Sequence, residues 1–209
     1  MKNKSAVPVF FCIPDITGFT KFVTSTDDPE FANIVISSVL NKVANANILE
    51  MDIAEIEGDA IFFYKTGRLP SVKKVAKQCQ LIYDTFNATI ADFQQSDPEL
   101  YIKYLSNNQL GIKIVIHHGH ITHTKINGHT KLMGEDVILA HKLLKNSIQE
   151  PCYILLTNKY LDKLKDKKVV KNWFHWESLK KGKDNYEHFG ATHYSYISLV
   201  DCNPINMSK

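Results

Sequence analysis

The sequence predicts an α/β protein in which a mostly antiparallel sheet carries its helices on one face. Two observations point to this class: apolar strand-like runs are separated by amphipathic helical segments, and two tight turns join consecutive strands directly. A third is that 44% of the 209 residues are apolar, which is enough to bury one sizeable core. We therefore expect a single domain over residues 1–209.

The first elements are a buried strand, two helices and a hairpin. An apolar run between prolines predicts a strand at about 8–14. A short helix should follow, and the break at 27–29 should separate it from a longer helix that ends near residue 46. The segment ILEMDIAEIEGDAIFFYK then predicts two strands that turn at Glu57-Gly58, because β-branched and aromatic residues flank a tight turn.

The later elements begin with a long amphipathic helix, because apolar residues recur at helical spacing from Val72 to Phe93. A connection at 96–109 leads to two strands joined at Asn127-Gly128, a hairpin turn signal. The rest of the chain should form a helix (135–148), a strand (152–157), a helix (158–166) and a final strand (186–200). The last three of these make up a strand–helix–strand unit at 151–200.

The composition excludes several classes of protein. The 25 basic residues are nearly balanced by 22 acidic ones, so no general attraction to nucleic acid or membranes is predicted. The first apolar run ends at Asp15, too early for a signal or spanning segment, and we expect a cytoplasmic protein. The four cysteines lack CxxC spacing, so neither a zinc knuckle nor a disulfide framework is predicted, and we expect reduced thiols.

Two carboxylates stand at strand ends. Asp15 ends the first predicted strand and Asp59 begins the third, so they converge if these strands are neighbours. Two hard oxygen ligands suit Mg²⁺ or Mn²⁺, which keep several waters and complete their shell with substrate phosphates. The alternative is that Asp15 caps a helix at Thr17 and Asp59 completes a turn. The residues alone support both interpretations equally.

Four segments carry a resemblance to a known family. They are FFCIPDITGFT, EIEGDAIFFY, IVIHHG and KLMGEDVILAHKLL. In that order they are similar to the FxDIxGFT opening, the second metal segment, the GIHTG strand and the DxxGxxVNxAxRL helix of class III nucleotidyl (adenylyl and guanylyl) cyclase catalytic domains. The resemblance covers about residues 8–145 and is closest to a bacterial family of cyclase-like proteins of undefined function. It implies a ferredoxin-like core.

By this resemblance, Asp15 and Asp59 hold two Mg²⁺ or Mn²⁺ ions, with the Ile16 carbonyl as a further ligand. One metal would activate the ribose 3′-oxygen for attack on the α-phosphorus, and the other would hold the β- and γ-phosphates. The backbone N–H groups of the next loop, at a helix N-terminus, would face the triphosphate. This loop consists of Thr17, Gly18, Phe19 and Thr20.

The resemblance also places two residues at the purine. Glu55 falls at a position that is Lys in adenylyl and Glu in guanylyl cyclases, and a carboxylate accepts from the N1–H and N2–H₂ groups of guanine. We therefore expect GTP to be favoured over ATP. Lys131 falls at the second base-reading position, where it would either donate to guanine O6 or pair with Glu55 and close the pocket. Glu57 has no family role and is interpreted as an exposed turn residue.

The helix that should stabilise the transition state departs from the family pattern. Ile138 stands where Asn is expected, and Lys142 stands where Arg is expected. Loss of one such donor costs on the order of 10²- to 10³-fold in rate, and Lys lacks the planar fork of a guanidinium. Arg68 is the only Arg of the chain and lies just after the third strand.

We therefore expect a signalling module that binds metal and nucleotide but is catalytically impaired, with Lys142 as a weak catalytic cation. The alternative is an active guanylyl-type cyclase with altered catalytic residues, which forms a cyclic nucleotide and pyrophosphate. The resemblance also implies a head-to-tail homodimer, in which Glu55, Lys131 and Lys142 face the partner's metal carboxylates.

The histidines give weaker signals. HHGHITH would place His118 and His120 on one strand face and His117 and His123 on the other. No third ligand completes a transition-metal site, so we interpret them as strand and surface residues. His141, on the predicted catalytic helix, is interpreted as polar surface rather than as a base.

Overall fold

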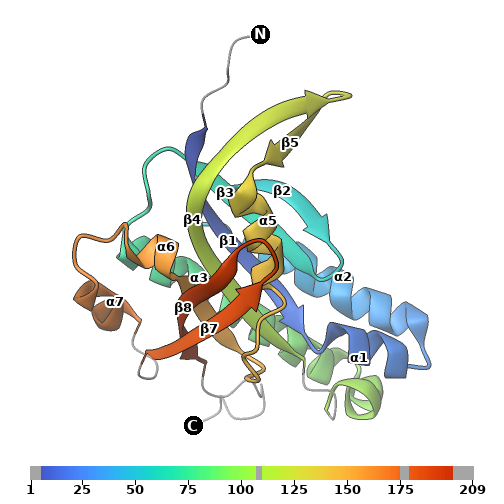
Figure 1. The fold of residues 1–209 in the computed structure, drawn as a ribbon. Coiled ribbons are helices and arrows are strands. Elements are labelled where there is room, and N and C mark those ends of the chain that lie inside the picture. The colour runs from blue at the N-terminus through green and yellow to red at the C-terminus, as the bar shows by residue number, and fades with distance from the viewer. Residues whose placement is uncertain (1–5, 107–109, 175–178, 200–209) are drawn as a thin grey trace.

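A computed structural model describes residues 6–106, 110–174 and 179–199 of the chain (Figure 1). The strands form one eight-stranded sheet with the order β2-β3-β1-β4-β6-β8-β7, and β5 pairs with the far end of β4. All neighbours are antiparallel except β4 and β6, so the predicted mostly antiparallel sheet is confirmed. The strands are β1 (Val7–Thr17), β2 (Asp52–Glu57), β3 (Ala60–Thr66), β4 (Gly111–Ile126), β5 (His129–Met133), β6 (Tyr153–Thr157), β7 (Lys180–Tyr186) and β8 (Gly190–Ser198).

Helices cover both faces of this sheet, but unequally. The main layer contains the two longest helices, and among the described elements α5 and the β5 hairpin pack on the opposite face (Figure 1). The expectation of helices on one face therefore holds for the main layer, and α5 is the exception. The helices are α1 (Phe19–Ser25), α2 (Pro29–Asn45), α3 (Val72–Ser96), α4 (Pro98–Leu100), α5 (Glu135–Leu143), α6 (Asn158–Leu161) and α7 (Lys168–Trp173), with a π-helical turn at Tyr101–Leu105.

Strand β1 supplies side chains to both layers. Phe10 and Cys12 belong to the core beneath α2 and α3, whereas Phe11 and Ile13 belong to the core beneath α5. This alternation follows from the pleat, which points successive side chains to opposite faces. A continuous apolar run is therefore the pattern of a central strand covered on both sides.

A buried polar network fixes α5 to the sheet. Asp136, in the first turn of α5, accepts hydrogen bonds from the His120 N–H at 2.7 Å and from Lys159 Nζ at 2.6 Å, and its Oδ1 lies 3.3 Å from His117 Nε2. Burial raises the pKa of Asp136, but these hydrogen bonds outweigh it and hold the pKa well below its usual range. The close approach needs Gly119, where a Cβ would lie 2.1 Å from Asp136 Cγ. His117 is not a surface residue: it is fully buried, and burial lowers its pKa.

The structure differs from the sequence-based expectations mainly near the C-terminus. The segment expected as one strand at 186–200 is instead the turn and second strand of a β7–β8 hairpin. Strand β7 was not predicted because its sequence, KKGKDNY, is polar on both faces. The helix expected at 158–166 already ends at Leu161, and α5 ends at Leu143 rather than at 148. Within the described residues, no helix combines the length and apolar character that crossing a bilayer requires.

The cysteines also differ from expectation. Cys12 and Cys79 are free and lie in the core beneath α2 and α3, as reduced thiols do. Cys152, at the start of β6, is disulfide-bonded. The prediction of reduced thiols was therefore wrong for Cys152, because isolated cysteines far apart in sequence give no spacing signal.

A two-carboxylate cavity as the candidate functional site

The pairing of β1 with two neighbours assembles the candidate site. Asp15 lies opposite Ala60 of β3 on one side and opposite Lys113 of β4 on the other. The residue before Ala60 is Asp59, whose carbonyl accepts a hydrogen bond from the Ile16 N–H at 3.2 Å. The side chains of Asp15 and Asp59 lie near enough for Asp59 to raise the pKa of Asp15. The first and third predicted strands are thus neighbours, and their carboxylates converge.

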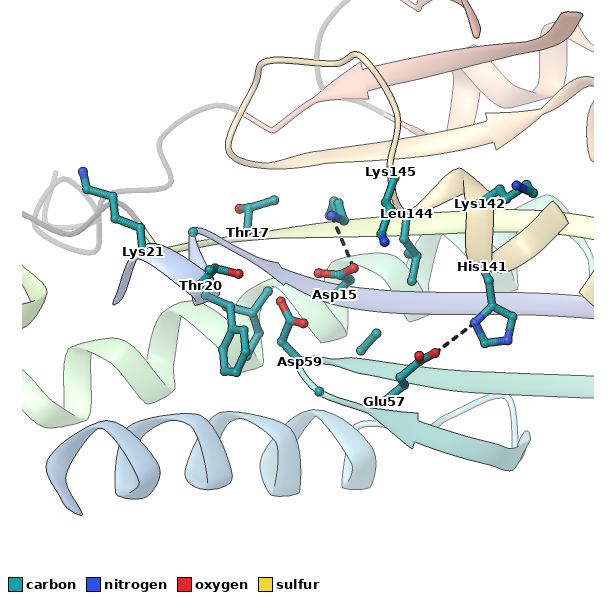
Figure 2. A pocket seen from close by; sticks show the side chains of 16 residues that line it. Asp15, Thr17, Thr20, Lys21, Glu57, Asp59, His141, Lys142, Leu144 and Lys145 are labelled. Carbon is teal, nitrogen blue, oxygen red and sulfur yellow. Dashed lines mark ion pairs between the residues drawn. The ribbon is translucent and has the colours of Figure 1, made fainter. Parts of the chain in front are cut away.

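These carboxylates line an open cavity of about 690 Å³ at the ends of β1 and β3 (Figure 2). All the residues expected at the metal and the triphosphate surround it, and so does the predicted catalytic lysine. They are Asp15, Ile16, Thr17, Gly18, Phe19, Thr20, Asp59 and Lys142. Glu55 and Lys131 do not line the cavity.

Asp15 is buried, whereas Asp59 is half-buried. The Asp15 side chain is 9% exposed, and its Oδ2 lies 3.3 Å from Lys113 Nζ. Its Oδ1 is buried and has no hydrogen-bond partner among the described residues. Burial raises the pKa of Asp15 to about 7; the Lys113 ammonium opposes this rise, and neighbouring Asp59 adds to it.

The alternative role of Asp15 as a helix cap does not match the structure. The residue that caps α1 is Gly18, and no side chain forms a cap hydrogen bond there. Gly18 has φ +79°, a left-handed conformation that lets the chain turn sharply from β1 into α1. The first N–H groups of α1 consequently have no partner four residues earlier and lie at the rim of the cavity. The Thr17 hydroxyl is already used, because it donates to the Pro151 carbonyl.

A divalent cation fits this donor set. The free Asp15 Oδ1 and the Asp59 carboxylate are two hard oxygen ligands beside an open cavity. No group of three or more His, Cys, Asp or Glu side chains suited to a metal occurs in the part of the chain that the structure describes. An ion held by Asp15 and Asp59 would therefore take the rest of its shell from water and a ligand, which is how Mg²⁺ and Mn²⁺ are usually bound.

Lysines surround the carboxylates, but they are not oriented alike. Lys113 forms an ion pair with Asp15, and Lys21 lies at the start of α1. In Figure 2, Lys145 extends from the end of α5 into the cavity toward Asp15, whereas Lys142 points away from both carboxylates. Ile138, at the position where the family has Asn, is 53% exposed and does not line the cavity.

The residues expected at the purine are paired within their own chain. Glu55 Oε2 lies 3.3 Å from Lys131 Nζ, and Glu55 Oε1 lies 3.0 Å from His141 Nε2. The other ring nitrogen of His141 lies 3.0 Å from Glu57 Oε2, and the ring stacks on Phe62 with centroids 4.0 Å apart. We call Glu55, His141 and Glu57 the Glu–His clasp. Both contacts are hydrogen bonds only when the imidazole carries two N–H groups, that is, when it is charged.

The clasp answers two questions that the sequence left open. Of the two roles considered for Lys131, the structure shows the pairing with Glu55. Glu57 is 68% exposed at its side chain, as a turn residue should be, but it also holds His141. The interpretation of His141 as ordinary polar surface is therefore wrong: it lines the cavity and joins it to Glu55.

Comparison with known proteins identifies the family. Residues 36–153, more than half of the chain, match the family described as "Protein of unknown function (DUF2652)". The chain belongs to the DUF2652 family. It is 31% identical over 108 residues to the uncharacterized protein Rv2561/Rv2562 of Mycobacterium tuberculosis, a match that covers 52% of this chain and 50% of that protein. The DUF2652 chain thus matches about half the length of this curated relative.

Solved structures similar to this DUF2652 protein are catalytic domains of class III nucleotidyl cyclases. The guanylyl cyclase Cya2 has a TM-score of 0.62 at 15% identity, with 92% of each chain covered. The adenylyl cyclase CyaB of P. aeruginosa has 0.59 at 13%, with 93% of this chain and 96% of that chain covered. The guanylate cyclase domain of RhGC from Catenaria anguillulae, in complex with GTP, has 0.55 at 14%, with 92% and 96% covered. These likenesses show a shared fold, and the resemblance stated from sequence is confirmed.

Sequence analysis missed three residues of the DUF2652 site. Lys113 can be assigned to the site only once the register of β1 and β4 is known, because that register places it opposite Asp15. Lys145 follows Lys142 by three residues, but its direction depends on where α5 ends. His141 was considered, yet nothing in the sequence places it between two carboxylates. Arg68 lines a separate cavity with Lys65 and Lys74, so it does not replace the missing guanidinium.

The raised pKa of Asp15 predicts how the stability of the metal-free protein depends on pH. A pKa of about 7 against an ordinary 3.8 means that the folded state binds more protons than the unfolded chain between these values. The free energy of unfolding should therefore fall as pH rises from about 4 to about 7. Above about pH 7, Asp15 should cause no further change. For Asp15→Asn we expect this fall to be smaller by on the order of 2–4 kcal/mol.

Urea unfolding with a chelator present, at about pH 5 and about pH 8, measures this difference. Groups remote from Asp15 titrate alike in both proteins, so the comparison reports on Asp15 together with the two groups that interact with it, Asp59 and Lys113. Parallel pH dependences in wild type and Asp15→Asn would show that Asp15 ionises normally.

Proposed function

We propose that this DUF2652 protein is a nucleotide cyclase-like module that binds a purine nucleoside triphosphate with divalent metal ions and is catalytically impaired. The observation that carries the proposal is the convergence of Asp15 and Asp59 at a cavity lined by lysines, in the cyclase fold. One structural neighbour is described in complex with GTP, which supports a triphosphate as the ligand. We further propose that residues 1–209 act as one domain, because one sheet runs through the described residues.

The proposed metal ligands are Asp15, Asp59 and the Ile16 carbonyl, with Mg²⁺ or Mn²⁺ in up to two positions. When bound, such ions would neutralise phosphate oxygens and polarise the attacking hydroxyl. The chain itself contributes the rest of the triphosphate site, through the N–H groups of Gly18, Phe19 and Thr20. Lys113 reduces the net negative charge of the Asp15–Asp59 pair, because its ammonium lies beside one oxygen of Asp15.

The proposed catalytic impairment rests on the chemistry of two substituted positions. The side chain at the position expected for Asn is the exposed, apolar Ile138, which has no hydrogen-bond donor. Lys142, at the position expected for Arg, points away from the carboxylates of its own chain (Figure 2). Even if it met a transferring phosphoryl group across the proposed dimer, Lys142 would lack the planar fork of a guanidinium. The lysines of the cavity favour the second candidate, an active guanylyl-type cyclase of altered mechanism, because they supply positive charge from other positions.

Guanine recognition requires the Glu–His clasp to open. Glu55 is the proposed base reader, but its two oxygens contact Lys131 and His141. A guanine edge would have to displace at least one of these partners. We propose that the clasp lowers nucleotide affinity in the isolated chain and that GTP is still favoured over ATP.

We also propose a head-to-tail homodimer that buries the clasp face. Large apolar side chains are exposed on β2, the β4–β5 hairpin and α5, and exposed apolar side chains gathered on one face are typical of interaction sites. These side chains are Ile53, Ile56, Ile126, Met133 and Ile138.

The first test measures binding and turnover together. Purified protein is titrated with each nucleoside triphosphate and Mn²⁺ by calorimetry, and cyclic product is sought by mass spectrometry. We expect metal-dependent binding and little or no product, because two lost donors at about 3 kcal/mol each approach a 10⁴-fold loss in rate.

Asp59→Ala should weaken metal-dependent binding by on the order of 100-fold, since even outer-sphere partners contribute 10- to 100-fold to metal affinity. Robust product from the wild type would instead support the active-cyclase candidate. Absence of any metal or nucleotide binding would contradict the proposed function, and the likeness to cyclases would then be one of fold alone.

The second test concerns the clasp. His141→Ala removes one partner of Glu55, and a partly exposed ion pair is worth about 0.2–1 kcal/mol, so we expect GTP affinity to rise by up to roughly fivefold relative to ATP. Glu55→Lys should abolish the preference for guanine. His193→Ala, at an exposed position of β8, is the matched control. A lower GTP affinity in His141→Ala would mean that His141 contacts the nucleotide itself.

The third test concerns assembly. Light scattering at high micromolar concentration, with Mn²⁺ and nucleotide, should give the mass of a dimer. Ile56→Lys should shift the protein toward the monomer, because a charge in a buried apolar contact costs desolvation. A monomer for the wild type under these conditions would contradict the dimer.

A further inference from the structure

We infer that Lys145, rather than Lys142, binds the phosphate groups of the ligand, and that it does so in the same chain that supplies Asp15 and Asp59. The inference rests on the proposed function, because it assigns a residue to the same site. It differs from the arrangement implied by the resemblance, in which the cation comes from Lys142 of a partner subunit.

The end of α5 sets the direction of Lys145. The helix stops at Leu143, and the Leu144 and Lys145 N–H groups bond to the carbonyls of His141 and Lys142, at 3.3 and 2.9 Å. Three-residue bonds of this kind tighten the last turn and change the course of the chain. Lys142, still on the helix, points away from the carboxylates, while Lys145, beyond it, extends into the cavity (Figure 2).

The residues on both sides of Lys145 are held firmly. Leu143 is fully buried in the core beneath α5. Asn146 Nδ2 donates to the Leu143 carbonyl at 2.8 Å, and the Asn146 amide exchanges hydrogen bonds of 2.7 and 3.0 Å with the Tyr153 hydroxyl of β6. The backbone that carries Lys145 is therefore positioned by the sheet rather than by a free loop.

The charge of Lys145 is available to a ligand. Of the lysines at the cavity, Lys113 pairs with Asp15 and is only 15% exposed at its side chain. Within the described ranges, the structure places no carboxylate in an ion pair with Lys145, which is exposed. A polyphosphate whose metal ion sits on Asp15 and Asp59 would bring negative oxygens into the cavity that Lys145 enters.

The chemistry of lysine defines what this contact does. An ammonium is a point charge that binds phosphate well but lacks the planar fork of arginine. Lys145 should therefore contribute to ground-state binding of a metal-bound polyphosphate, whatever base it carries. Because Lys145 and the carboxylates line one cavity of one chain, this binding should not require a second subunit.

The test compares two neighbouring lysines. Binding of Mn²⁺–tripolyphosphate and Mn²⁺–GTP to the full chain is measured by calorimetry for Lys145→Ala and for Lys142→Ala, which removes the same charge three residues earlier. We expect Lys145→Ala to weaken both ligands about tenfold, Lys142→Ala to weaken them less than about twofold, and Lys145→Arg to restore most of the loss. Equal unfolding midpoints of the variants verify that the fold is intact.

Each outcome decides the inference. If the wild type binds and Lys142→Ala is the weaker variant, or if Lys145→Ala binds like the wild type, the assignment of Lys145 is overturned while the proposed function stands. If the wild type binds neither ligand, the proposed function fails and the assignment fails with it.

Co-expression of differently tagged Asp59→Ala and Lys145→Ala chains separates the two arrangements. A cation from the partner subunit would recreate one intact site in each mixed dimer and restore tight binding of Mn²⁺–tripolyphosphate. A cation from the same chain leaves every site defective. We expect no restoration, and restored binding would overturn the same-chain assignment.

Discussion

The pairing of β1 with β3 on one side and β4 on the other is the constraint on which the rest of the site depends. It places Asp15 between Asp59 and Lys113, so that one short stretch of sheet holds two carboxylates and an ammonium. The same pairing makes β1 a central strand with side chains in both cores, which leaves its end with little freedom to move. The geometry of the carboxylates is therefore a property of the sheet and not of the loop that follows β1.

A second constraint determines what faces these carboxylates. Helix α5 packs on the face of the sheet opposite α2 and α3, and Asp136 ties its first turn to β4 and to Lys159. The ionised Asp136 and the buried His117 hold the N-terminal end of α5, while Leu143 holds the other end in the core. The side chains between and beyond these anchors, His141 and Lys145, reach the cavity as a consequence. The residues of this polar network do not line the cavity, yet the network positions the clasp and the lysine.

How much of this could be predicted from the sequence differs between the fold and the site. The sheet and the long helices follow from patterns within short segments. The convergence of Asp15 and Asp59 depends on which strands pair, and only the resemblance to cyclase domains favoured it over the cap and turn roles. The β7 strand could not be predicted, because its polar residues give no alternation and it forms only by pairing with β8. The pairing of Glu55 with Lys131 was one of two roles considered for Lys131. The contact of Glu55 with His141 could not be predicted, since His141 comes from a later helix whose packing sets the distance. Lys145 was missed because its direction depends on where the helix ends. Lys142 lies on α5, whereas Lys145 lies beyond the end of α5 and points in another direction.

The state of Asp15 gives the physical reason to regard the cavity as a binding site. A buried carboxylate normally satisfies its lone pairs, because an unpaired polar atom removed from water destabilises the fold. Lys113 satisfies Oδ2, but Oδ1 has no partner among the described residues, and burial raises the pKa of the group to about 7. Neither a helix cap nor a turn accounts for that oxygen, since Gly18 caps α1. A cation beside Oδ1 and Asp59 would offset the desolvation and favour the ionised form of Asp15, so the unfavourable state of Asp15 in the protein alone becomes favourable when a metal-bound ligand is present.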